Sequence, residues 1–252
     1  MDYAQSRLQA RFGERPDELL WQRLEGVLEP AAALEIASTS GLRRWVAGIP
    51  AHADGHEIEI ALRARWRECV AEIASWMPGN WQPAILWTRG LVDLPALCYL
   101  ARGGAPLPWM FGDPALQVYA RADATTRESM LREDCRALLE PSFEGLGGAS
   151  VAASPGPTQI CQAWLDEWRR RWPRWSDSAA LESLVRLLDA AIKQPAAMGR
   201  PELRRKLRSL FRRSVLRPVV VFIYIAFAAL DIERLRAGLL QHALAREGII
   251  TS

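Results

Sequence analysis

The sequence predicts an all-α protein, a multi-helix bundle of two helical lobes. Apolar residues recur every three to four positions in most segments, as Ile160, Trp164 and Trp168 do, and this spacing is typical of one face of an α-helix. Strand patterns are nearly absent, because residues 219–225 form the one β-branched run. The chain has 252 residues, of which 50% are hydrophobic and 24% charged, so we expect it to bury a sizeable core.

The N-terminal half is expected to contain helices that proline and glycine separate. Residues 3–12 are mixed in character and predict no clear element. The clearest element is a helix over residues 54–77, in which apolar residues hold one side and charged residues such as Arg63 hold the other. Asp93 is expected to cap a further helix over residues 94–102, which Gly103 ends.

A segment rich in glycine, serine and proline, residues 141–157, divides the sequence. No apolar periodicity survives in it, as is typical of a linker. The sequence therefore predicts an N-terminal helical lobe over residues 1–140 and a C-terminal helical lobe over residues 158–252. A basic helix that Pro201 opens is expected in the second lobe.

Residues 217–248 join the most apolar run of the sequence to a short charged signature. The run over residues 219–230 carries no charge. A membrane span is one interpretation, but 13 residues separate Arg217 from Asp231, whereas ~18 to 20 are needed to cross a bilayer. A buried strand over residues 219–225 is also compatible with periodicity alone. The helical pattern that follows without a break favours one long core helix.

Catalytic, phosphate-binding and metal-binding motifs do not stand out in the sequence. His52 and His56 have a spacing that would place both imidazoles on one helix face for a metal, but Pro50 and Gly55 indicate a turn there. The glycines over residues 145–148 lack the Gly-Lys-Ser/Thr that completes a phosphate-binding loop. We therefore expect no enzymatic activity, no metal, no cofactor and no small-molecule substrate.

The cysteines and the N-terminus indicate an intracellular location. Cys69, Cys98, Cys135 and Cys161 stand far apart, form no CxxC pair and are expected to be reduced thiols in the core. The first residues lack an apolar segment, so no secretory signal is expected and the cytoplasm is the expected location. The net charge of +3 is too small to require an anionic partner.

Two basic clusters form the strongest local signal. Cations interleaved with tryptophans suit a nucleic-acid backbone with stacked bases, and attraction to a membrane surface is another interpretation. The favoured interpretation is that these arginines pair with acidic faces of neighbouring helices or of a partner protein. The candidate residues of this basic surface are Arg169, Arg170, Arg171, Arg204, Arg205, Arg208 and Arg212.

Two segments carry a shared motif. Residues 231–236, Asp-Ile-Glu-Arg-Leu-Arg, follow a proline-started apolar helix, and Asp93, Leu97 and Arg102 have a similar spacing in the first half. In both, the chain resembles the C-type (in eukaryotes, d-type) central-stalk family of V-type and A-type rotary ATPases. The repeats of this all-helical family carry an acidic residue, a leucine four positions on, and an arginine shortly after. The two copies amount to a faint internal repeat.

The resemblance, to a divergent and shortened member, implies a non-catalytic helical spacer between the central shaft and the membrane ring of an ion-pumping ATPase. Such a protein has other proteins as partners in a membrane-associated complex and no transmembrane segment of its own. A helical scaffold or adaptor of another assembly is the alternative, and a nucleic-acid-binding protein is less favoured. The residues implied in contacts between helices or with partners are Asp93, Leu97, Arg102, Tyr224, Asp231, Leu235 and Arg236. Asp231 and Arg234 are also within reach of each other on one helix face, and we favour a role in holding the protein's own helices together.

Overall fold

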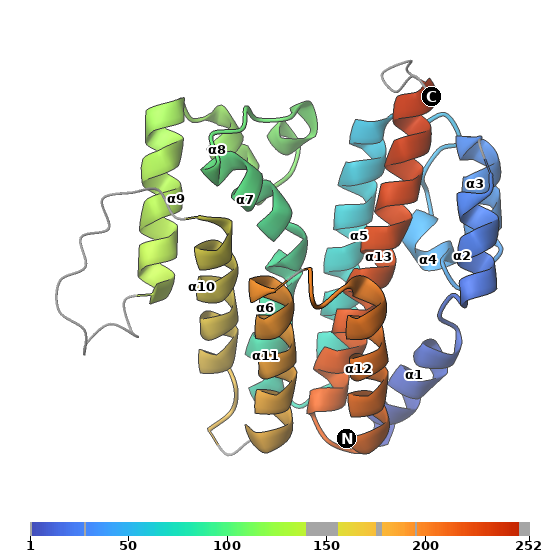
Figure 1. Cartoon of the computed structure of the whole chain (residues 1–252), viewed down its shortest axis with the longest axis vertical. Coiled ribbons are helices and arrows are strands. Elements are labelled where there is room, and N and C mark those ends of the chain that lie inside the picture. Colours follow the sequence, from blue (N-terminus) through green and yellow to red (C-terminus); the bar gives the residue numbers. More distant parts are fainter. Residues whose placement is uncertain (1, 28, 140–155, 175–177, 195, 247–252) are drawn as a thin grey trace. The chain divides into compact units, whose positions relative to one another are not determined.

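The computed structural model describes residues 2–27, 29–139, 156–174, 178–194 and 196–246 (Figure 1). Within these residues the chain forms thirteen α-helices and three 3₁₀ helices, and it contains no strand. The predicted all-α fold class is therefore confirmed. Most of the linker predicted over residues 141–157 lies outside the described residues.

Contacts divide the chain into two units. Unit 1 comprises Met1–Met77 and Val215–Ser252, and unit 2 comprises Pro78–Ser214. The ends of the chain belong to one unit because the last helix packs against α1, α3 and α5. The lobes predicted over residues 1–140 and 158–252 have other bounds and stay a prediction.

Unit 1 is built around two long helices, α5 (Gly55–Ser75) and α13 (Val219–Arg246). They pack side by side (Figure 1). The segment that the sequence left open between strand, membrane span and core helix is helical, and all but two residues of its apolar run over residues 219–230 are buried. A helix that is apolar all round must be covered on every side, which explains the shorter helices around it.

Four shorter helices complete unit 1: α1 (Asp2–Gly13), α2 (Glu18–Glu25), α3 (Pro30–Ser38) and α4 (Arg43–Val46). Large aromatic side chains fill the space between these helices and the long pair. Trp66 of α5 is fully buried and stacks on Trp45 with 6.4 Å between ring centroids. Phe12 of α1 meets Phe227 of α13 edge-on at 5.2 Å, an arrangement that aromatic pairs prefer.

The start of α5 agrees with its sequence signal. Asp54 is the N-cap, and its carboxylate accepts a hydrogen bond from the Glu57 amide at 2.8 Å. The Glu57 carboxylate in turn accepts one from the Asp54 amide at 3.0 Å. This reciprocal capping box satisfies two amides that a helix leaves without internal partners. The helix ends at Ser75, two residues before the predicted end.

Unit 2 consists of shorter helices arranged around α10 (Pro157–Arg170), which contacts α6, α7, α9 and α11. The predicted apolar face of α10 is confirmed, because Ile160, Trp164 and Trp168 are all buried. The remaining elements are η1 (Gly79–Trp81), α6 (Gln82–Trp87), η2 (Thr88–Val92), α7 (Leu94–Ala101), η3 (Pro108–Phe111), α8 (Gln117–Arg121), α9 (Ala124–Leu139), α11 (Ser178–Lys193) and α12 (Arg200–Arg213).

Asp93 occupies the N-cap position of α7, as predicted, but its side chain makes no capping hydrogen bond. An N-cap residue usually has extended backbone angles, whereas Asp93 has φ −84° and ψ −28°. These helical angles arise because η2 runs directly into α7. The expected capping mechanism is therefore wrong for Asp93, and its carboxylate lines a cavity instead.

Within the described residues, no single helix is both long and apolar enough to span a membrane. The segments Gly79–Val92 and Leu94–Ala101 pass the same test only as a pair, and they are bent by 52° at the break between them.

Candidate functional site

The charged signature of α13 is bound to the N-terminal part of unit 1. Arg15, between α1 and α2, donates from Nε and Nη2 to the two carboxylate oxygens of Asp231, at 2.7 and 2.8 Å. The Asp231 side chain is 3% exposed and that of Arg15 is 13% exposed. The Arg15 guanidinium also lies 4.2 Å from the ring centroid of Phe227. A bidentate pair of this kind fixes both distance and orientation.

Arg234, one turn further along α13, binds two carboxylates of α2. It donates to both oxygens of Glu18 at 2.8 and 3.0 Å, and its Nε donates to Glu25 at 2.8 Å. The hydrogen bond to Glu18 raises the pKa of the Arg234 guanidinium. The local pairing of Asp231 with Arg234 that the sequence suggested is thus replaced by hydrogen bonds to residues from the start of the chain.

Arg236 connects α13 to α5. Its Nε donates to Glu59 Oε2 at 2.5 Å, and Arg63 Nη1 lies 3.6 Å from the other Glu59 oxygen. Glu59 and Arg63 are both buried, with side chains 4% and 3% exposed. The sequence placed Arg63 on a solvated face of α5, and this is wrong because α13 covers that side of the helix. We call Asp231, Arg234 and Arg236 with their partners the charged clamp.

The other two motif residues of α13 are part of the core. Tyr224 and Leu235 are each 3% exposed. Burial raises the pKa of the Tyr224 phenol to about 12, so this hydroxyl stays neutral at physiological pH. Neither residue offers a surface to a partner, and both contribute packing.

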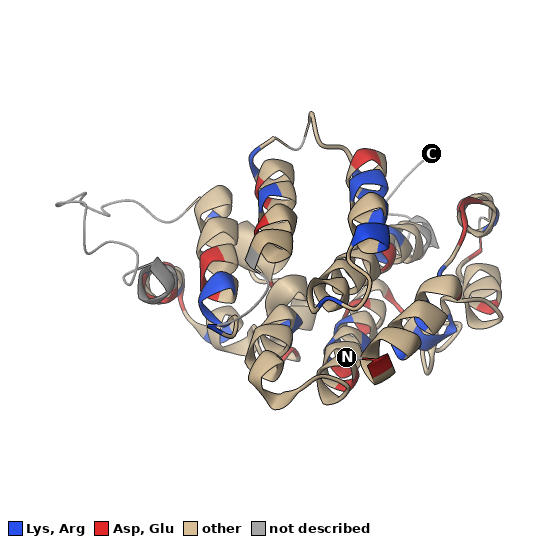
Figure 2. Cartoon of the chain, turned by 90° about the horizontal axis from the view of Figure 1, so that it is seen from below, with Lys and Arg blue, Asp and Glu red and all other residues tan. Residues whose placement is uncertain are grey.

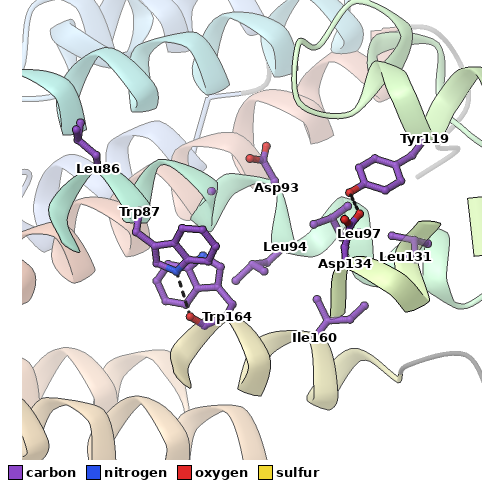
Figure 3. Close-up of a pocket in the computed structure, with 11 residues that line it drawn as sticks. Leu86, Trp87, Asp93, Leu94, Leu97, Tyr119, Leu131, Asp134, Ile160 and Trp164 are labelled. Carbon is purple, nitrogen blue, oxygen red and sulfur yellow. Dashed lines mark hydrogen bonds between the residues drawn. The ribbon is translucent and has the colours of Figure 1, made fainter. Parts of the chain in front are cut away.

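The first copy of the motif lies in unit 2 and has different surroundings. Asp93 is buried and Leu97 is half-buried, and both line a cavity of about 310 Å³. Arg102 is exposed at the C-cap of α7. In Figure 3, Trp87 and Trp164 form one end of this cavity, and Tyr119 with Asp134 form the other. The two copies of the motif therefore have no common structural role.

The first basic cluster is paired internally. Arg169 donates to both carboxylate oxygens of Glu182 on α11, at 2.9 and 2.8 Å. Arg170 and Arg171 both pair with Glu167, at 2.9 and 2.7 Å. These contacts agree with the favoured interpretation of pairing with acidic helix faces, and they leave little free charge for a phosphate backbone.

The second basic cluster is more open. Figure 2 shows Lys and Arg along α12, which has seven basic residues and one acidic residue, a net charge of +6, against +3 for the whole chain. Arg205 pairs with Glu202 at 2.7 Å, and Arg204 is half-buried. Arg208 and Arg212 are exposed, and neither forms an ion pair with the described part of the chain.

Two cysteines that the sequence separates are neighbours in the fold. Cys98 of α7 and Cys161 of α10 belong to one apolar cluster with Ile160. A hydrogen bond from Cys98 lowers the pKa of the Cys161 thiol from 9.0 to about 7. Cys69 is buried in unit 1, and burial raises the pKa of its thiol. Cys161 is therefore the more reactive thiol, contrary to the expectation of four separate core thiols. Cys135 has no described side chain.

We expect iodoacetamide to alkylate Cys161 with a rate that rises to half its maximum near pH 7, because the thiolate is the nucleophile. Replacing Cys98 by alanine removes the hydrogen bond and should move this midpoint upward, toward the ordinary thiol value. Mass spectrometry of the peptide that contains Cys161, over a range of pH, measures both. An unchanged midpoint in the Cys98→Ala protein would contradict the assigned cause.

Within the described residues, no three His, Cys, Asp or Glu side chains come together in a way that could hold a metal ion. The His52 and His56 pair therefore has no third ligand among those residues. Comparison with protein-family models, with curated proteins and with solved structures finds no match to this chain.

Proposed function

We propose that this chain is a non-catalytic helical subunit of a membrane-associated complex, acting as the spacer between the shaft and the membrane ring of a V/A-type rotary ATPase. The resemblance of its two acidic-leucine-arginine segments to the C-type central-stalk family gives the specific role. The observation that supports it is the charged clamp, which engages every charged position of the α13 motif that faces another helix. A spacer needs a stiff body rather than a reaction centre.

The clamp stiffens unit 1 in a way that sequence-local ion pairs do not. It joins α13 to the segment before α2 through Arg15, to α2 through Glu18 and Glu25, and to α5 through Glu59. Buried pairs hold their geometry because separating the partners leaves an uncompensated charge in the core. Load applied to α13 is thereby shared among three other segments.

The exposed cations of α12 are the surface that we assign to a neighbouring protein of the complex. Their charge is concentrated, since the rest of the chain carries a net negative charge when α12 is set aside. Complementary charge mainly sets the rate and the orientation of association. An acidic face on the neighbouring protein is therefore the expected counterpart.

Isolation of the tagged chain from membranes of its native host tests the proposal. We expect the ATP-hydrolysing and membrane-ring proteins of a rotary ATPase to be recovered with it in constant proportion. The same isolation with Arg208→Glu and Arg212→Glu should recover less of the neighbouring protein, whereas Arg205→Gln, at a position already paired, should not. Recovery of the chain alone, or in another assembly, would contradict the rotary role and favour the scaffold alternative.

Nucleic-acid binding gives a separate, opposite result. Because most of the Arg169 to Arg171 cluster is paired, we expect no retention on duplex or single-stranded DNA at ~50 mM salt. Retention with a steep dependence on salt, lost in the Arg208→Glu and Arg212→Glu protein, would show that α12 binds phosphates instead of an acidic protein surface.

A further inference from the structure

The cavity of unit 2 has the size and the walls of a small-molecule site. Its volume is about 310 Å³, near the lower end of the ~300–1,000 Å³ that such sites span. We propose that it binds a small, mainly apolar molecule that carries one uncharged hydroxyl group. This inference goes beyond the spacer function and does not depend on it.

The apolar walls are formed in advance. Trp87 and Trp164 stack with ring centroids 6.3 Å apart and planes 21° from parallel. Trp87 Nε1 donates to the Trp164 carbonyl oxygen at 3.1 Å, which holds the two indoles together (Figure 3). Leu94 and Leu97 lie between this aromatic wall and Tyr119 (Figure 3). A site that is already ordered pays little conformational entropy when a ligand enters.

A polar corner of the cavity is incomplete. Trp164 is 8% exposed, and its Nε1–H has no hydrogen-bond acceptor among the described residues, which is rare for a buried donor. A Cβ atom built on Gly90 would lie 3.5 Å from this nitrogen and 3.9 Å from Asp93 Oδ2. The N–H donor and the carboxylate acceptor thus flank the side of Gly90 on which any other residue would carry its side chain.

The chemistry of this corner selects a hydroxyl. A hydroxyl oxygen accepts one hydrogen bond and donates another, so one group can accept from Trp164 Nε1 and donate to Asp93. A hydrocarbon satisfies neither. An amine donates to the carboxylate when protonated but offers the indole N–H no acceptor.

The charge of the lining excludes anions. Asp93 and Asp134 both line the cavity, and no Lys, Arg or His lines it. Tyr119 donates to Asp134 Oδ2 at 2.5 Å, which keeps the second carboxylate at the far end of the cavity (Figure 3). A ligand carboxylate or phosphate would meet two like charges in a partly dry space.

Titration of the full chain with 2-phenylethanol tests the proposal, with the indole N–H signals of ¹⁵N-labelled tryptophan as the readout. Trp164→Phe identifies the Trp164 signal. We expect this signal to move downfield and saturate with a dissociation constant on the order of 1 mM or below. Phenethylamine should bind at least tenfold more weakly, and 3-phenylpropanoate should not bind.

Gly90→Ala is the matched variant. Its added methyl group would make an ordinary contact with Trp164, at 3.5 Å, so the fold should persist while the polar corner is filled, and affinity for the alcohol should fall at least tenfold. Gly79→Ala is the control, because a Cβ there meets nothing within 4 Å and Gly79 does not line the cavity.

Trp164→Phe provides a second check by calorimetry, since it keeps an aromatic ring but removes the N–H. The variant should lose the preference for 2-phenylethanol over phenethylamine. No shift of the Trp164 signal at ~10 mM alcohol, tighter binding of the amine or the carboxylate, or full affinity in Gly90→Ala would each overturn the proposal.

Discussion

Replacing Asp231 by alanine is expected to lower the free energy of unfolding of unit 1 by about 3–5 kcal/mol. The substitution removes one partner of a buried bidentate pair and leaves the Arg15 guanidinium uncompensated beside the ring of Phe227. The loss exceeds that of an ordinary ion pair because Arg15 has been taken out of water and cannot recover its hydration without moving away from α13.

Arg234→Ala is the matched control on the same helix. Its carboxylate partners Glu18 and Glu25 have side chains 64% and 54% exposed, so water compensates for most of the lost interaction and the expected cost is about 1 kcal/mol or less. A second comparison, Arg15→Met with Asp231→Leu, removes both charges of the buried pair and should restore much of the lost stability.

Hydrogen exchange in urea separates the two units, because the amides of α13 report on unit 1 and those of α10 report on unit 2. Asp231→Ala should reduce protection in α13 much more than in α10. Equal effects of Asp231→Ala and Arg234→Ala would contradict the different burial of the two pairs as the cause.

The long helices were predictable from sequence because their signals are local. The helix α5 has a capping box within four residues, and α13 has an apolar run too continuous to be anything but covered. The helix α1 gave no such signal, since its sequence is mixed. Its position depends on contacts such as that of Phe12 with Phe227, which lies 215 residues further along the chain.

The charged clamp shows why the residues of a site can be predicted without their partners. Sequence spacing favours Asp231 with Arg234, because residues three apart share a helix face. The fold instead brings Arg15 to Asp231 across 216 positions. An exposed local pair contributes little, whereas a bidentate pair in the core satisfies a buried carboxylate that would otherwise be costly. Burial therefore decides the partner, and sequence spacing does not encode it.

The cavity and the cysteine pair were beyond sequence reasoning for a related reason. Trp87 and Trp164 come from α6 and α10, and Cys98 and Cys161 come from α7 and α10. Each pair depends on how α10 packs among its neighbours. The periodicity of α10 indicates which face is buried, but not which helix that face meets.

Replacing Gly41 by alanine is expected to destabilise unit 1 by about 3 kcal/mol. A Cβ atom on Gly41, in the turn between α3 and α4, would lie 1.8 Å from the carbonyl oxygen of Glu14. The obstacle is backbone, so no side-chain rotation relieves it, and the turn must move away from residues 14 and 15. Because Arg15 holds Asp231, this displacement also disturbs the charged clamp.

Gly238→Ala is the opposite case in the same unit. Gly238 lies within α13, and a Cβ there meets nothing within 4 Å, so alanine should stabilise the helix by ~0.5–1 kcal/mol through its lower conformational entropy in the unfolded chain. Urea unfolding of both variants, with hydrogen exchange in α13, measures the difference in sign. If Gly41→Ala were as stable as the parent protein, the turn would not press on the backbone of Glu14, and Arg15 would need another means of being held against α13.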